Sequence, residues 1–85
     1  MKFNELDVVK TTKDFSENGI NNGDIGVVVF SFTTPNEAYE VEFNDSNGKP
    51  KATFPILPQH LELAHETNAK PIIKTHVFGK LRQAQ

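Results

Sequence analysis

The stretch Gly19-Ile-Asn-Asn-Gly-Asp-Ile-Gly-Val-Val-Val-Phe30 places three glycines within eight residues, immediately before an apolar run. A nucleotide-binding loop needs another order: a strand, then glycines, then a helix whose N-terminus meets the phosphates. Here Val-Val-Val-Phe follows Gly26 and favours a strand, and neither a GxGxxG nor a GxxxxGK[ST] pattern is present. We therefore interpret Gly19 and Gly23 as turn residues, and Gly26 as a close backbone approach or bulge.

Strand signals continue on both sides of this stretch. Residues 8–12 have the β-branched content of a first strand, and Phe3 and Leu6 ahead of it are expected in the core. Residues 13–24 are rich in turn formers and predict a long connecting loop. The apolar run from Ile25 to Phe32 predicts a central strand buried on both faces, which would place Phe30 or Phe32 inside.

The clearest alternation in the chain lies in residues 38–43. Tyr39, Val41 and Phe43 fall on one side, and Glu40 and Glu42 fall on the other, roughly 7 Å apart. This pattern predicts a half-buried strand with an acidic outer face.

The segments that follow predict the rest of a small sheet. Residues 44–48 have the composition of a hairpin turn, and residues 51–54 form the return strand, with Ala52, Phe54 and Ile56 on one side. Residues 57–60 fit a single 3₁₀ turn and residues 61–63 a short closing strand.

Five short strands, a long loop after the first and a 3₁₀ turn before the last predict an all-β fold, a small five-stranded SH3-like barrel. We assign residues 1–64 to this barrel. Residues 65–85 form a basic C-terminal extension, in which residues 71–78 have the composition of an added strand.

Composition narrows the functional classes. The chain has no cysteine, which excludes disulfides and thiolate chemistry, and no apolar run approaches the roughly 20 residues that span a bilayer. We expect no membrane association and a cytoplasmic location. Residues 1–64 carry ten acidic side chains against five lysines, whereas residues 65–85 carry one glutamate against four basic side chains. An acidic body repels nucleic acid and attracts basic partners.

No motif in the sequence indicates catalysis, a metal or a cofactor. The histidines His60, His65 and His76 lack the spacing of a zinc site. Residues 44–48 lack the twelve-residue spacing of a calcium loop. Glu40 and Glu42 could form a carboxylate pair, but an open sheet face offers no burial to raise a pKa. We expect no enzyme activity, no catalytic residue and no cofactor.

Three ordered segments resemble a family of short bacterial proteins of unknown function. They are Phe3 with Glu5–Asp7 and Val9, then Gly23-Asp24-x-Gly26-x-Val28, and the hairpin from Tyr39 to Gly48. The resemblance covers residues 2–64 and implies an SH3-like barrel similar to KOW-type modules. Some members are encoded beside toxin-like proteins, so the resemblance also implies an immunity or antitoxin role. It supplies no catalytic residue.

The first functional hypothesis is a non-enzymatic module that binds another protein, as an immunity protein or antitoxin occluding a basic toxin. The expected contact residues share a negative charge: Asp14, Glu17, Glu37, Glu40, Glu42 and Asp45. Two alternatives remain open. A KOW-like accessory module would contact RNA or the translation machinery through the basic extension, although the acidic barrel disfavours nucleic acid. A structural subunit of a larger enzyme is the other. The sequence assigns neither the partner's identity nor an oligomeric state.

Overall fold

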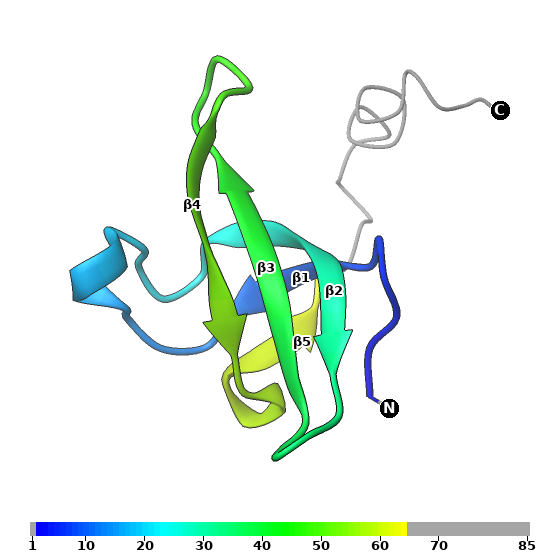
Figure 1. The fold of residues 1–85 in the computed structure, drawn as a ribbon. Coiled ribbons are helices and arrows are strands. Elements are labelled where there is room, and N and C mark those ends of the chain that lie inside the picture. Colours follow the sequence, from blue (N-terminus) through cyan, green and yellow to red (C-terminus); the bar gives the residue numbers. More distant parts are fainter. Residues whose placement is uncertain (1, 65–85) are drawn as a thin grey trace, which may run out of the picture.

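The computed structural model describes residues 2–64, which form one antiparallel sheet of five strands (Figure 1). The strands are β1 (Val8–Thr11), β2 (Ile25–Phe32), β3 (Ala38–Asn44), β4 (Pro50–Ile56) and β5 (Leu61–Leu63). Two 3₁₀ turns, η1 (Ser16–Asn18) and η2 (Pro58–His60), interrupt the connections. The predicted all-β, five-stranded SH3-like barrel is therefore confirmed. The predictions of a basic extension at 65–85 and of an added strand at 71–78 fall outside the described residues.

The order β4-β3-β2-β1-β5 leaves β4 and β5 at the edges of the sheet. The sheet curves so that β3 and β4 pass in front of β1 and β5 in the view of Figure 1. Pro50 and Pro55 both lie in β4, and proline is tolerated at an edge because it cannot donate to a ladder.

One hydrophobic core fills the curve of the sheet. Its buried side chains come from all five strands, the segment before β1 and the β1–β2 loop: Phe3, Val9, Ile20, Val28, Tyr39, Val41, Phe43, Ile56 and Leu61. The alternation in β3 is confirmed, since Tyr39, Val41 and Phe43 are buried and the residues between them are not. Phe54 and Ala52 pack against the same cluster from β4, as the pattern predicted.

The loop between β1 and β2 is more ordered than its turn-rich sequence indicates. Phe15 and Ile20 form an isolated antiparallel bridge around η1, and Ile20 is fully buried. The buried hydroxyl of Thr11 donates to the carbonyl oxygen of Asn21 at 2.9 Å and accepts the N–H of Asp24 at 3.2 Å. These bonds attach the loop to the first strand and satisfy a polar group that would be costly to bury alone.

Two expectations about the core are wrong. Leu6 is 68% exposed, with a φ of 75°, because the chain turns there before it enters β1. The strand β2 is not buried on both faces: Ile25 is 45% exposed and Phe30 is 50% exposed. The sheet is a single curved layer, so within residues 2–64 only one face of β2 meets the core.

Candidate protein-binding surface

A bulge in β2 turns the phenylalanines outward. The pairing register runs from Val28 opposite Val41 directly to Phe30 opposite Glu40, so Val29 is the extra residue. A strand without this bulge would place Phe30 on the same face as buried Val28. One inserted residue instead moves Phe30 and Phe32 to the face that points away from the core. The expectation that either phenylalanine lies inside is therefore wrong.

We call this surface the outer face, and define it by eight residues of β2, β3 and β4. They are Val27, Phe30, Phe32, Ala38, Glu40, Glu42, Thr53 and Pro55. The rings of Phe30 and Phe32 meet edge to face, with centroids 4.9 Å apart. Exposed aromatic and aliphatic groups gathered in this way are typical of interaction surfaces.

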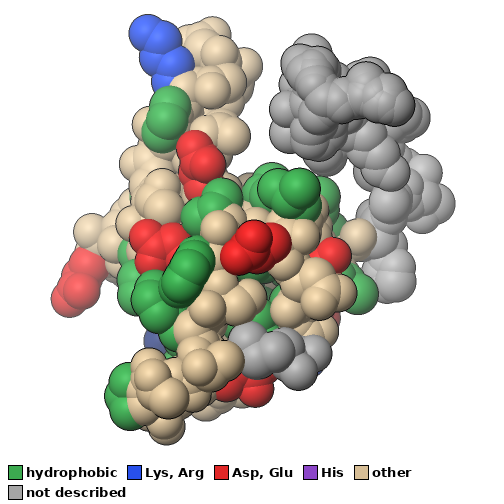
Figure 2. Space-filling view, turned by 45° about the vertical axis from the view of Figure 1, so that its right-hand side comes forward, with side chains coloured by type: hydrophobic (Ala, Val, Ile, Leu, Met, Phe, Trp, Pro, Cys, Tyr) green, Lys and Arg blue, Asp and Glu red, His purple; other side chains and the backbone are tan. Residues whose placement is uncertain are grey.

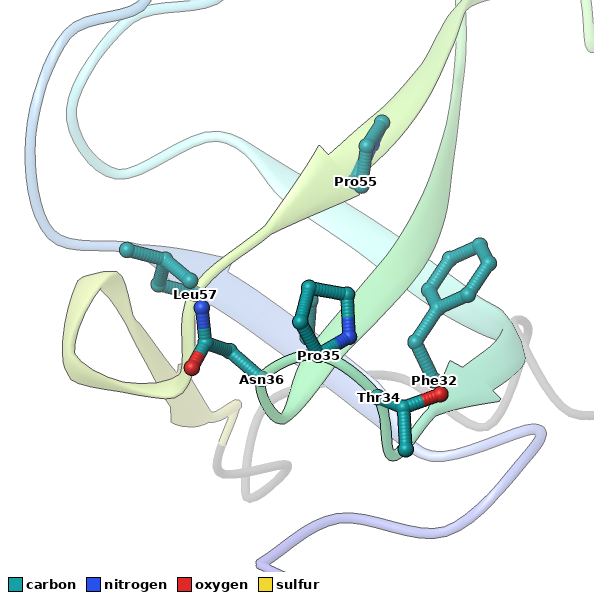
Figure 3. Close-up of a pocket in the computed structure, with 7 residues that line it drawn as sticks. Phe32, Thr34, Pro35, Asn36, Pro55 and Leu57 are labelled. Atoms are coloured by element: carbon teal, nitrogen blue, oxygen red, sulfur yellow. The ribbon is translucent and has the colours of Figure 1, made fainter.

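A shallow pocket of about 260 Å³ lies at one end of the outer face. Its walls come from β2, β3 and β4, from the loop between β2 and β3, and from the residue that follows β4: Phe32, Thr34, Pro35, Asn36, Ala38, Pro55 and Leu57. Pro35 lies between Phe32 and Leu57 in the close-up of Figure 3. Because most of these groups are apolar, the pocket suits a hydrophobic side chain rather than a charged group.

Glu40 and Glu42 are the two charged residues of the outer face, and both are half-buried. Glu40 lies between Phe30 and Pro55 of the neighbouring strands, and Glu42 lies between Val27 and Thr53. They are thus less open to solvent than the sequence predicted. Among residues 2–64, the one ion pair within 4.0 Å joins Lys10 to Glu62 at 3.4 Å. Neither carboxylate of the outer face has a cationic partner within that part of the chain.

The four other predicted contact residues lie elsewhere, and three of them hold local structure. Asp14 accepts the N–H of Asn22 at 2.8 Å in the β1–β2 loop. Asp45 accepts the N–H groups of Asn47 and Lys49 at 2.8 and 3.0 Å in the β3–β4 hairpin.

Glu37 lies two residues before Tyr39 and accepts bonds from the Tyr39 hydroxyl and from the N–H of Lys2. Glu17, in η1, is exposed and bonds to no other described residue. The six acids therefore come from three separate segments of the fold. On the side shown in Figure 2, acidic side chains stand singly among hydrophobic ones.

Among residues 2–64, Glu37 and Tyr39 have shifted pKa values. The hydroxyl of Tyr39, and after it the N–H of Lys2, holds the pKa of Glu37 below its ordinary value of 4.5. Burial, and then the bond to Glu37, raises the pKa of Tyr39 above its ordinary value of 10.0. The hydrogen bonds among Lys2, Phe3, Glu37 and Tyr39 join the N-terminal segment to the core side of β3, away from the outer face.

The lowered pKa of Glu37 predicts a loss of stability in acid. The unfolded chain binds the proton at a higher pH than the folded one, so stability falls as the pH drops below about 4.5 and through the folded pKa. Thermal unfolding followed by circular dichroism between pH 3 and pH 7 measures this. We expect Glu37→Gln to flatten the acid limb of the profile and Glu17→Gln, the matched control, to leave it unchanged. An unchanged profile in Glu37→Gln would contradict the role of this carboxylate.

Other kinds of site have little support in the described part of the chain. Within residues 2–64, no three histidine, aspartate or glutamate side chains gather where they could hold a metal ion. No helix in the same range is long and apolar enough to cross a membrane.

The fold and this surface define a small SH3-like barrel with an apolar, acid-bearing outer face. Residues 5–63 match a family described as a domain of unknown function (DUF4926), and the chain belongs to that family. No curated protein and no solved structure matches the chain. The expectation of a family without an assigned function is confirmed, while the bacterial origin of its members stays a prediction.

Proposed function

We propose that this protein is a non-enzymatic binding module that recognises a basic protein partner through the outer face. The observation that carries the proposal is the combination of exposed Phe30 and half-buried Phe32 with two half-buried carboxylates that lack a cation among residues 2–64. Interface centres are enriched in aromatic groups. Complementary charge raises the association rate and excludes wrong partners.

More specifically, we propose that the protein is an immunity protein or antitoxin that acts in the cytoplasm and occludes a basic toxin. Its support is the resemblance set out above, together with the acidic excess of the barrel. Occlusion requires only a stable complex over the toxin's basic surface, so the barrel itself needs no catalytic group. Of the six predicted contacts, we assign Glu40 and Glu42 the leading role because Asp14, Glu37 and Asp45 already bond within the barrel.

Reversing the charge of the outer face tests this proposal. In the full chain, we expect Glu40→Lys with Glu42→Lys to weaken binding of the basic partner by about 100-fold, or about 2.7 kcal/mol. The partner is first recovered by pull-down from nuclease-treated lysate of the native host and identified. Its affinity for each purified variant is then measured by calorimetry at two salt concentrations.

A matched control changes the net charge equally at another place. Glu5→Lys with Glu62→Lys alters two exposed acids, and the Lys10–Glu62 pair it removes is a surface pair of small energetic weight. We expect this control to lower affinity by less than about threefold, through long-range charge alone. Equal effects of the two double variants, or no effect of the first, would contradict recognition by the outer face.

Nucleic acid binding is a second candidate because the ring of Phe30 is exposed and the half-buried ring of Phe32 lies beside it. Aromatic rings on a sheet surface can stack on bases. However, Glu40 lies directly opposite Phe30 in the neighbouring strand, and its charge repels phosphates. Recovery of RNA or ribosomal proteins that is abolished by nuclease would favour this candidate over the first.

A further inference from the structure

The outer face presents a regular row of side chains along β3. Ala38, Glu40 and Glu42 occupy alternate positions of this strand, on the side opposite the buried Tyr39 and Val41. Alternate residues of a strand are roughly 7 Å apart. Ala38 also lines the apolar pocket, so the row begins at the pocket and continues with two carboxylates.

The neighbours of the row make its charges selective for long basic side chains. Phe30 and Pro55 lie on either side of Glu40 in the adjacent strands. A lysine or arginine that reaches Glu40 can therefore pack its aliphatic stem on these two groups, and its charge can lie against the ring of Phe30. A carboxylate among apolar neighbours also attracts a cation more strongly than one in open water.

We propose that the row recognises an extended segment of the partner protein, with one hydrophobic residue in the pocket and basic residues two and four positions away. This inference rests on the proposed function and adds to it the form of the recognised element. Alternate side chains of an extended segment repeat at the same distance as the row, so three of them can meet Ala38, Glu40 and Glu42 together.

An α-helix matches the row less well. Side chains on one face of a helix repeat every four residues, with a rise of about 6 Å per repeat. Two such repeats are therefore about 1–2 Å shorter than the distance from Ala38 to Glu42 along the row. The pocket of about 260 Å³ is also sized for one side chain, not for a helix face. The recognised pattern is thus hydrophobic-x-basic-x-basic, in either chain direction.

A random dodecapeptide library displayed on phage, selected on the immobilised full chain, tests the inference. We expect enrichment of sequences with one hydrophobic residue and two basic residues in the two-residue spacing. Binding of a synthetic peptide containing Leu-Ser-Lys-Ser-Lys is then compared with that of one containing Leu-Lys-Ser-Ser-Lys, which has the same composition. We expect the second peptide to bind at least tenfold more weakly.

Two variants test whether the bound peptide contacts the row. Glu40→Gln with Glu42→Gln removes the charges but keeps the shape, and should abolish the tenfold preference for correct spacing. Ala38→Leu fills the pocket from a half-buried position outside the core, and should weaken peptides with a large hydrophobic residue more than those with alanine there. Circular dichroism of each variant confirms that the barrel is folded.

Several results would overturn the inference. Among them are failure to enrich any sequence, equal binding of enriched peptides to the glutamine variant, and enrichment at helical spacing. Enrichment of sequences like residues 70–82 of this chain would instead assign the row to the chain's own C-terminal extension. If the selection fails while charge reversal still abolishes binding of a basic protein, recognition of a linear segment is wrong and the proposed function remains.

Discussion

Replacement of Gly26 by alanine is expected to lower the free energy of unfolding by about 3 kcal/mol. A Cβ at this position would lie 2.6 Å from Cγ1 of Val41, 2.8 Å from Cε1 of Phe43 and 2.9 Å from the carbonyl oxygen of Glu42. Val41 and Phe43 belong to the core, and the third atom is backbone of the paired sheet, so none can move aside cheaply. Urea unfolding at constant pH gives the difference.

Gly23 provides the matched control for this substitution. Its φ is +94°, and a Cβ there would meet nothing within 4 Å. Gly23→Ala should therefore cost only about 1 kcal/mol, from the left-handed backbone alone. If the two substitutions were equally destabilising, the backbone conformation would explain both, and the close approach of β2 to β3 at Gly26 would not be the cause.

Each feature of the fold that could be predicted has a local signal in the sequence. At Gly26, where the strand begins, the sequence predicts a close backbone approach or a bulge, and the structure shows the close approach. The face of β3 followed from strict alternation between Tyr39 and Phe43. The 3₁₀ turn predicted over residues 57–60 is present at Pro58–His60, where the proline stands at the start of the turn.

The outer face could be predicted only in part because the β-bulge that forms it leaves no periodic signal in the sequence. In the apolar run from Ile25 to Phe32, every register looks alike, so the extra residue Val29 could not be distinguished from its neighbours. The position of this bulge decides whether Phe30 is inside or outside. The carboxylates at Glu40 and Glu42 were predicted because they alternate, but their apolar neighbours depend on strand pairing far along the chain.

Long-range pairing also explains the assignments that failed or were missed. Leu6 has the side chain of a core residue, but its backbone N–H bonds to the carbonyl of Val28, and the turn made there directs the side chain into solvent. Ile20 stands in a turn-rich loop and is nevertheless fully buried, because the bridge to Phe15 brings it to the core.

Removal of the Tyr39 hydroxyl is the second change with a large expected effect. The ring of Tyr39 is fully buried, and its oxygen accepts the N–H of Lys2 at 2.9 Å and the N–H of Phe3 at 3.2 Å. The same hydroxyl donates to the carboxylate of Glu37. Tyr39→Phe removes all three bonds and leaves the N–H of buried Phe3 without a partner. We expect a loss of about 2 kcal/mol in thermal or urea unfolding.

This loss should be concentrated at the N-terminal segment. Phe3 packs its ring edge to face against Tyr39 with centroids 5.2 Å apart, and Tyr39→Phe keeps this contact. Amide hydrogen exchange should therefore accelerate at Phe3 by more than the change in global stability requires, while Val41 follows the global change. Glu37→Gln, which retains an acceptor for both donors, is the control and should cost less than half as much. Uniform acceleration across the barrel, or a loss below about 0.5 kcal/mol, would show that the hydroxyl does not hold the N-terminal segment against β3.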